Sequence, residues 1–213
     1  DIKFSGVTKI FEPDIVALED VYLNIDRGEF VYLVGETGSG KTTLMRCIFR
    51  EVIPSRGHIS VGGRALRKMG RFELALFRRD IGVIFQDFSL LPNITAFENV
   101  AFVLEVMGVP SREIEERVAD VLKTVGIWRR RNLYPPQLSG GEQQRLAIAR
   151  AIVNEPSLIL ADEPTGNLDS HTADEIMQLM LDINAAGTTV IMATHNQAIV
   201  DTYRHRVVEI RRG

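Results

Sequence analysis

The sequence has little cysteine, few aromatic residues and no long apolar run. Of its 213 residues one is cysteine, Cys47, and 7% are aromatic. A single cysteine excludes a disulfide framework and a cysteine-rich zinc site, and we expect Cys47 to be a small buried apolar residue. The longest apolar runs, among them 30–34 and 100–104, are far shorter than the roughly 18 residues of a membrane-spanning helix. The sequence therefore excludes a disulfide-rich secreted protein and a membrane-spanning protein.

An excess of charge of one sign is lacking as well. The chain has 25 Lys and Arg against 28 Asp and Glu, a net charge of −3, with 45% apolar and 25% charged residues. That composition is typical of a soluble globular protein, and the length predicts one domain, 1–213, with its own core. Because nucleic-acid binding depends mainly on neutralised phosphates, we expect no nucleic-acid partner. No signal peptide is visible, and the chain starts with Asp rather than Met, so we expect native residues before it.

Four short apolar segments predict the strands of a buried parallel sheet. Each runs into glycine-rich or polar residues, and helical stretches separate them; the segments are 30–34, 81–85, 158–161 and 188–193. This pattern is typical of an α/β fold, in which ligands bind at the carboxyl ends of the strands. Alternating apolar residues in 3–25 and 58–61 predict an additional small antiparallel sheet.

The segment 88–153 has few strand signals and predicts a helical lobe inserted between two strands. One helix should start at Pro110 and Ser111, with Ser111 as its N-cap, and stop at Gly126; a second should run from about 141 to 153. Apolar residues recur at helical spacing in the first helix, at Ile114, Val118, Leu122 and Val125. We therefore divide the domain into a core, 1–87 and 154–213, and a helical subdomain, 88–153.

A phosphate-binding loop follows the first predicted strand. Residues 35–42, Gly-Glu-Thr-Gly-Ser-Gly-Lys-Thr, match the pattern G-x-x-x-x-G-K-[ST] without a gap. The glycines let backbone N–H groups curl around phosphates, and the following helix adds the positive end of its dipole. We expect Lys41 to contact the β- and γ-phosphates and Thr42 to bind Mg²⁺. The loop predicts a nucleoside triphosphate site.

Two adjacent acids follow the third predicted strand. Asp162 and Glu163 come directly after the apolar residues 158–161. Beside a phosphate loop, Asp162 fits the acid that organises Mg²⁺, and Glu163 is then available to polarise an attacking water. The pair predicts hydrolysis of the bound triphosphate.

Residues 138–145, Leu-Ser-Gly-Gly-Glu-Gln-Gln-Arg, resemble the signature motif of the ATP-binding cassette (ABC) ATPases. A Ser-Gly-Gly turn at a helix start is an anion site, and in the family it faces the γ-phosphate held by the partner subunit. The resemblance covers essentially the whole chain. It implies a RecA-like parallel sheet with an antiparallel β-subdomain and a helical lobe. It also implies ATP and Mg²⁺ as ligands, an ATP-dependent homodimer and an integral membrane partner. Through that partner the chain would be a peripheral protein at the cytoplasmic face of the bacterial plasma membrane.

The resemblance also assigns the remaining site residues. Gln86 takes the place of the Q-loop glutamine, Asp169 lies in the D-loop and His195 is the switch histidine. Phe11 matches the aromatic residue that stacks on adenine, which is more often Tyr, and Val16 flanks the same base. The implied catalytic residues are Lys41, Gln86, Glu163 and His195, and the implied Mg²⁺ ligands are Thr42, Gln86 and Asp162. The implied nucleotide contacts are Phe11, Val16, Gly35, Glu36, Thr37, Gly38, Ser39, Gly40, Lys41, Thr42, Thr43, Gln86, Ser139, Gly140, Gly141, Glu142 and Asp169.

Within the family, the segments 78–88, 193–196 and 204–208 most resemble the cell-division ATPases, which regulate peptidoglycan hydrolases through a membrane partner at the division site. Asn196 is informative because the export ATPases usually have Asp after the histidine. An export ATPase for lipoproteins or macrolides is the alternative, and a nucleotide-gated scaffold is less favoured. A chromosome or DNA-repair ABC ATPase is disfavoured because only 53 residues separate Gln86 from Ser139, too few for a coiled-coil insertion.

Overall fold

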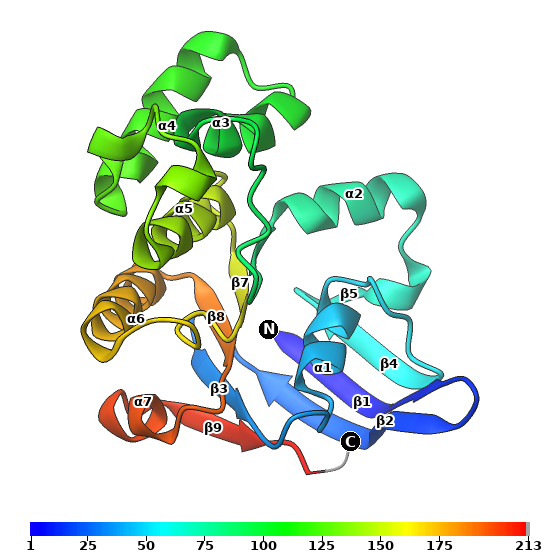
Figure 1. Ribbon diagram of the computed structural model, residues 1–213. Coiled ribbons are helices and arrows are strands. Elements are labelled where there is room, and N and C mark those ends of the chain that lie inside the picture. The colour runs from blue at the N-terminus through cyan, green and yellow to red at the C-terminus, as the bar shows by residue number, and fades with distance from the viewer. Residues whose placement is uncertain (212–213) are drawn as a thin grey trace.

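The computed structural model of the protein describes residues 1–211 and contains a parallel sheet and an antiparallel sheet (Figure 1). The parallel sheet has the strand order β6-β7-β8-β3-β9. Its strands are β3 (Phe30–Val34), β6 (Ile81–Ile84), β7 (Leu158–Asp162), β8 (Thr189–Ala193) and β9 (Arg206–Glu209). The four predicted strands are confirmed to within one residue at either end, and β9 is an edge strand that we did not predict.

The predicted antiparallel sheet is also confirmed. Its order is β2-β1-β4-β5, with β1 (Ile2–Phe11), β2 (Ile15–Ile25), β4 (Arg56–Val61) and β5 (Arg64–Ala65). At the start of β1, Ile2 and Phe4 are buried whereas Lys3 between them is exposed. This alternation leaves one face of the sheet for the core and the other for solvent.

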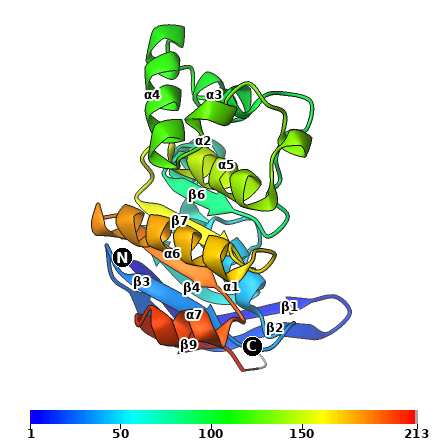
Figure 2. The same ribbon diagram turned by 60° about the vertical axis from the view of Figure 1, so that its left-hand side comes forward.

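Helices cover both faces of the parallel sheet and form a separate lobe at one end of the molecule (Figures 1 and 2). The lobe contains α3 (Ala96–Val106), α4 (Ser111–Thr124) and α5 (Gly140–Ile152), with the short 3₁₀ turns η2 (Trp128–Arg130) and η3 (Pro135–Gln137). The other helices are α1 (Lys41–Ile48), α2 (Arg71–Arg79), α6 (Ser170–Ala185) and α7 (Gln197–Thr202), and η1 (Leu66–Lys68) precedes α2. No helix within residues 1–211 is long and apolar enough to cross a membrane.

The strand β3 shows why the central strands read as continuous apolar runs. Phe30 and Tyr32 pack into a hydrophobic core shared with the lobe helices and α6, whereas Val31 and Leu33 pack into a second core shared with α1 and the antiparallel sheet. Both faces of the strand are therefore buried, as expected for a parallel sheet covered on both sides. The parallel sheet core, the antiparallel sheet and the helical lobe are all present as predicted.

One predicted helix cap is wrong. Ser111 is the first helical residue of α4, and the N-cap position is Pro110, whose extended backbone (φ −60°, ψ 141°) provides no side-chain cap. The predicted end is confirmed, because Gly126 has φ +79° and follows the C-cap residue Val125. The helix α5 spans Gly140–Ile152, so it starts and ends one residue earlier than the expected 141–153.

Candidate active site

The loops that follow the strands of the parallel sheet meet at one edge. Leu33 pairs with Ala193, Asp162 pairs with the same Ala193, and Ile84 pairs with Ala161. Because these strand ends are in register, the phosphate loop, Gln86, the acid pair and His195 all leave the sheet on the same side. The fold thus places four separate sequence motifs along the carboxyl edge, where ligands of such sheets bind.

The phosphate loop is folded tightly around the first residue of α1. The ammonium of Lys41 donates to the carbonyl oxygens of Gly35 at 2.7 Å and Glu36 at 2.9 Å. Gly40 has φ +109°, and a Cβ there would lie 2.3 Å from the Ala17 carbonyl oxygen, so only glycine fits. The hydroxyl of Ser39 is buried and has no hydrogen-bond partner among the described residues. An orphaned buried hydroxyl in such a loop fits a polar ligand such as a phosphate.

A hydroxyl and a carboxylate suited to a divalent cation lie together beside this loop. Thr42 Oγ1 donates to Asp162 Oδ2 at 2.9 Å, although 120 residues separate the two in sequence. Burial raises the pKa of Asp162 above its usual range, and the hydrogen bond from Thr42 opposes that shift. Hydroxyl and carboxylate oxygens are the ligands that Mg²⁺ prefers, so this pair fits the cation. Gln86 follows β6 on the same edge and is exposed.

Glu163 and His195 form a second pair at this edge. Glu163 Oε1 lies 2.7 Å from His195 Nδ1, and the His195 backbone N–H donates to Glu163 Oε2 at 3.4 Å. The Glu163 side chain is only 10% exposed, whereas that of His195 is 68% exposed. Glu163 has φ +49°, a left-handed conformation that is uncommon outside glycine, and its N–H donates to the Ala193 carbonyl. Strained backbone that aims a carboxylate at a histidine is typical of a functional site.

The signature turn lies at the start of α5 and contacts the start of α6. Ser139 is the N-cap of α5 and Asp169 that of α6. A Cβ on Gly141 would lie 2.6 Å from Thr172 Cγ2, so glycine lets the two helix starts approach closely. The Ser139 backbone N–H donates to the Glu142 carboxylate and is the main cause of its lowered pKa. Hydrogen bonding with the Arg130 and Ser139 side chains lowers that pKa further. The α5 helix therefore starts with an ionised carboxylate beside the turn.

Within one chain, the signature turn and the phosphate loop line two different cavities. A cavity of about 320 Å³ is lined by residues of the signature turn and the D-loop, including Ser139, Gly141 and Asp169. Another, of about 370 Å³, is lined by the phosphate loop and residues 209–211. The two cavities share no lining residue.

The proposed base-stacking residues lie on the hairpin of β1 and β2. Phe11 ends β1 and is 37% exposed, and Val16 on β2 is 45% exposed. In the register of the hairpin Val16 faces Ile10, next to Phe11. The Lys9 ammonium lies 4.8 Å from the centre of the Phe11 ring. The Phe11 ring is therefore partly exposed at the end of the hairpin, with the Lys9 ammonium over one of its faces.

Sequence reasoning missed two features near the site. The residue after β9, Ile210, donates its N–H to the Val34 carbonyl at 2.8 Å, and its own carbonyl fills the space where a Cβ on Gly35 would lie. The β-branched residues Val207, Val208 and Ile210 carried a weak strand signal. Arg130 donates from Nε to Glu142 Oε1 at 2.8 Å, and nothing in the sequence marks that contact.

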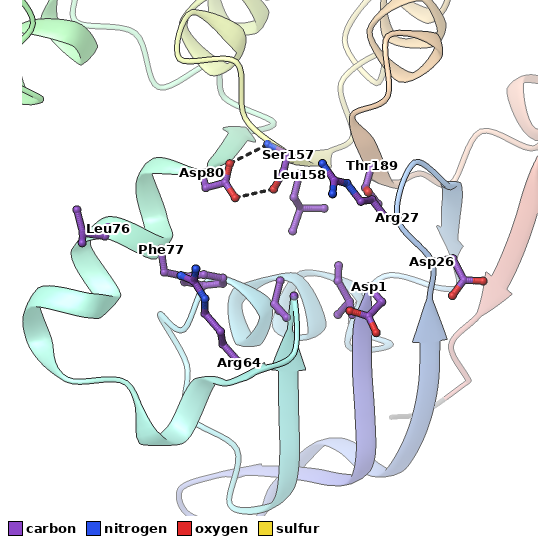
Figure 3. Close-up of a pocket in the computed structure, with 13 residues that line it drawn as sticks. Asp1, Asp26, Arg27, Arg64, Leu76, Phe77, Asp80, Ser157, Leu158 and Thr189 are labelled. Atoms are coloured by element: carbon purple, nitrogen blue, oxygen red, sulfur yellow. Dashed lines mark hydrogen bonds between the residues drawn. The ribbon is translucent and has the colours of Figure 1, made fainter.

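The cavity in Figure 3 lies at the opposite, amino edge of the parallel sheet. It measures about 260 Å³, and none of its lining residues is a predicted site residue. Its central feature is structural, because the Asp80 carboxylate accepts hydrogen bonds from the Ser157 backbone at 3.1 Å and hydroxyl at 2.6 Å. These bonds tie the start of β6 to the start of β7.

Comparisons with known proteins agree with the motifs. The ABC transporter family matches residues 18–166. The chain is 48% identical over 212 residues to the cell division ATP-binding protein FtsE of Bacillus subtilis. It is 50% identical over 213 residues to the FtsE of Mycobacterium tuberculosis. Each match covers all of this chain and 93% of the relative. The dimeric ATP-binding cassette MJ0796, solved in a post-hydrolysis state with ADP and Pi, superposes with a TM-score of 0.91 at 40% identity, covering all of this chain and 95% of that one. The chain therefore belongs to the ABC transporter ATP-binding family and, within it, to the FtsE-like members.

Proposed function

We propose that this protein is the ATP-hydrolysing subunit of a bacterial cell-division complex and drives a membrane partner resembling FtsX to regulate peptidoglycan hydrolysis. The observation that carries the ATPase is the carboxyl edge of the parallel sheet, where the Thr42–Asp162 and Glu163–His195 pairs lie beside the phosphate loop. The similarity over the whole chain to FtsE supports the biological role.

Binding of ATP uses charge and backbone dipoles rather than a deep pocket. Lys41 exchanges the Gly35 and Glu36 carbonyls for the β- and γ-phosphates, and the N–H groups of 36–43 and the start of α1 add further donors. Phe11 and Val16 hold the adenine base. Thr42, Asp162 and Gln86 would hold Mg²⁺, which offsets phosphate charge when bound.

In the proposed hydrolysis, Glu163 and His195 have different tasks. Glu163 accepts a proton from the attacking water while the water oxygen forms a bond to the γ-phosphorus. The bond between that phosphorus and the bridging oxygen breaks, and ADP and phosphate leave. His195, held by Glu163 at 2.7 Å, orients the carboxylate and presents its exposed ring to the γ-phosphate.

The nucleotide site is completed by a second copy of the chain. The separate cavities at the signature turn and the phosphate loop support this arrangement. In a twofold dimer, Ser139, Gly140, Gly141, Glu142 and Asp169 of one subunit would face the phosphate loop of the other. ATP would then bind between subunits, and its binding would favour the dimer.

The complex lies at the cytoplasmic face of the plasma membrane at the division site, attached through its membrane partner. The two parts of the domain have separate tasks in this proposal. The core, 1–87 and 154–213, holds the nucleotide, and the helical subdomain, 88–153, presents the signature turn to the partner copy.

Co-purification distinguishes the cell-division role from the exporter alternative. The chain is co-expressed in turn with tagged FtsX and with the membrane subunits of a lipoprotein-releasing and a macrolide exporter. We expect it to be retained by FtsX in detergent and to show FtsX-dependent ATP hydrolysis. Selective retention by an exporter subunit would refute the cell-division role and leave the ATPase assignment intact.

A further inference from the structure

The helix α2 is anchored to the rest of the protein by one of its faces. Phe77 is buried and Leu74 is half-buried, and both pack against the core that α1 shares with the antiparallel sheet. The Arg78 guanidinium donates to the carbonyl oxygens of Phe49 and Arg50, at 3.1 and 3.0 Å. The helix runs along the outside of the molecule, between the lobe and the antiparallel sheet (Figure 1). These contacts fix which way its other face points.

The face of α2 opposite these contacts exposes large apolar side chains. Phe72 is 78% exposed, and Leu76, one turn later, is 44% exposed. Ala75 and Arg79, three and seven residues after Phe72, are exposed as well. Residues at this spacing lie on the same side of a helix. The helix therefore presents an apolar stripe that ends in a cation and that nothing within residues 1–211 covers.

The surroundings of this stripe are strongly basic, although the whole chain has a net charge of −3. Residues 64–79 contain a single acid, Glu73, and six cations: Arg64, Arg67, Lys68, Arg71, Arg78 and Arg79. All six cations are exposed, and none of them forms an ion pair within the described residues. Their charge is therefore available to an anionic surface.

A second exposed apolar pair, on α3, has the opposite electrostatic surroundings. Phe102 and Val106 are also one turn apart and are 47% and 65% exposed. The exposed acids Glu98 and Glu105 lie on the same helix, which has no cation. An anionic surface would attract the apolar pair of α2 and repel that of α3, so charge distinguishes two otherwise similar features.

An apolar stripe flanked by Lys and Arg is typical of helices that lie in the interface of an anionic membrane. The apolar side chains of such a helix insert between the headgroups, and its cations bind lipid phosphates. With nine residues α2 is far too short to cross a bilayer, so it would lie along the surface. The projecting Phe72 side chain would then leave water without needing a preformed groove in a partner.

We propose that the exposed face of α2 is a membrane-contact surface for anionic phospholipids, in which Phe72 and Leu76 insert between headgroups while Arg71 and Arg79 bind their phosphates. The inference goes beyond the proposed function, in which the chain reaches the membrane through its protein partner. The contact with lipid adds to that attachment and does not need the partner.

The test is co-sedimentation of the chain, without ATP or a partner, with vesicles over a range of lipid concentrations. Vesicles of phosphatidylcholine are compared with vesicles in which half of it is replaced by phosphatidylglycerol. We expect binding to the anionic vesicles only, and it should weaken as salt is added. Phe72→Ser/Leu76→Ser should weaken this binding about tenfold. Arg71→Gln/Arg79→Gln should weaken it about thirtyfold, since each cation near the surface contributes about a factor of five.

Two matched variants change the same residue types elsewhere. Phe102→Ser/Val106→Ser removes the exposed apolar pair of α3, and Arg129→Gln/Arg204→Gln removes two exposed cations outside α2. Both should bind anionic vesicles like the wild type. Unchanged melting curves would show that all four double variants are folded.

The outcomes separate a lipid surface from a protein partner. A chain that binds neither kind of vesicle, binds both equally, or keeps its binding in either α2 variant would overturn the proposal. If the α2 variants lost retention by FtsX but kept vesicle binding, α2 would instead dock on the protein partner. A chain that binds anionic vesicles through α2 but is not retained by FtsX would support the lipid contact and contradict the proposed cell-division role.

Discussion

Mixing two inactive variants tests how the site is assembled. Lys41→Ala removes the ammonium from the phosphate loop, and Ser139→Arg blocks the signature turn with a bulky cation. The Lys41 ammonium contacts only loop carbonyls, and the lost α5 cap costs only about 1 kcal/mol, so both variants should stay folded. Each variant alone is expected to be inactive, because both of its sites lack one motif.

The magnitude follows from the twofold arrangement. In a random equimolar mixture about half of the dimers are mixed, and each mixed dimer has one doubly damaged site and one intact site, so about a quarter of all sites are intact. If the sites act independently, phosphate release should recover to about a quarter of wild type. It should approach half if ATP favours mixed dimers over the damaged homodimers.

Phosphate release is measured at a fixed total concentration while the ratio of the two variants is changed, with cross-linking as a second measurement. We expect activity to be highest near the equimolar point and absent at either end. No recovery of either activity or ATP-dependent cross-linking would refute the composite site, because motifs that serve one nucleotide within one chain cannot complement each other. Cross-linking without hydrolysis would retain the composite site and show that two intact sites must act together.

Four single substitutions extend these tests. Glu163→Gln should bind ATP normally but release phosphate about 10²–10⁴-fold more slowly, as expected for a lost general base; near-normal single-turnover rates would exclude Glu163 as the base. Lys41→Ala should lose tight ATP binding in a fluorescence titration while keeping its melting curve, because its ammonium contacts only loop carbonyls; unchanged affinity would contradict the phosphate-loop assignment. Asp162→Asn should melt at a higher temperature than wild type at pH 7, because burial raises the pKa of Asp162 and its ionised form destabilises the fold. That gain should shrink as the pH falls through the raised folded-state pKa, where the wild-type carboxyl also becomes neutral, and a gain that grows on acidification would contradict the direction of the shift. Leu146→Ala should lower the free energy of unfolding by about 2–5 kcal/mol in urea titrations, because Leu146 is fully buried in the lobe core; a loss below that range would indicate that the core closes around the cavity.

Most of the fold and the motif positions followed from local sequence. The phosphate loop was predictable because all of its parts lie within eight consecutive residues. Its glycines allow the left-handed backbone that the loop needs, and Lys41 supplies the cation. The central strands were predictable because burial on both faces leaves an uninterrupted apolar run, as at Phe30–Val34. The edge strand β9 was not, because its residues are mostly exposed and only pairing with β3 makes them a strand. The cap at Ser111 was misplaced by one residue, because Ser111 is already helical and Pro110 has the extended N-cap conformation.

The sequence by itself determined which chemical groups the protein has: a phosphate loop, an acid pair and a Ser-Gly-Gly turn, each made of adjacent residues whose types dictate their function. Only the tertiary structure decided which groups meet. The register of the parallel strands brings Thr42 to Asp162 and Glu163 to His195, and the turn before α5 brings Arg130 to Glu142. It also keeps the signature turn and the phosphate loop in separate cavities. Such pairings depend on strand order and helix packing across many residues, and no local pattern encodes them.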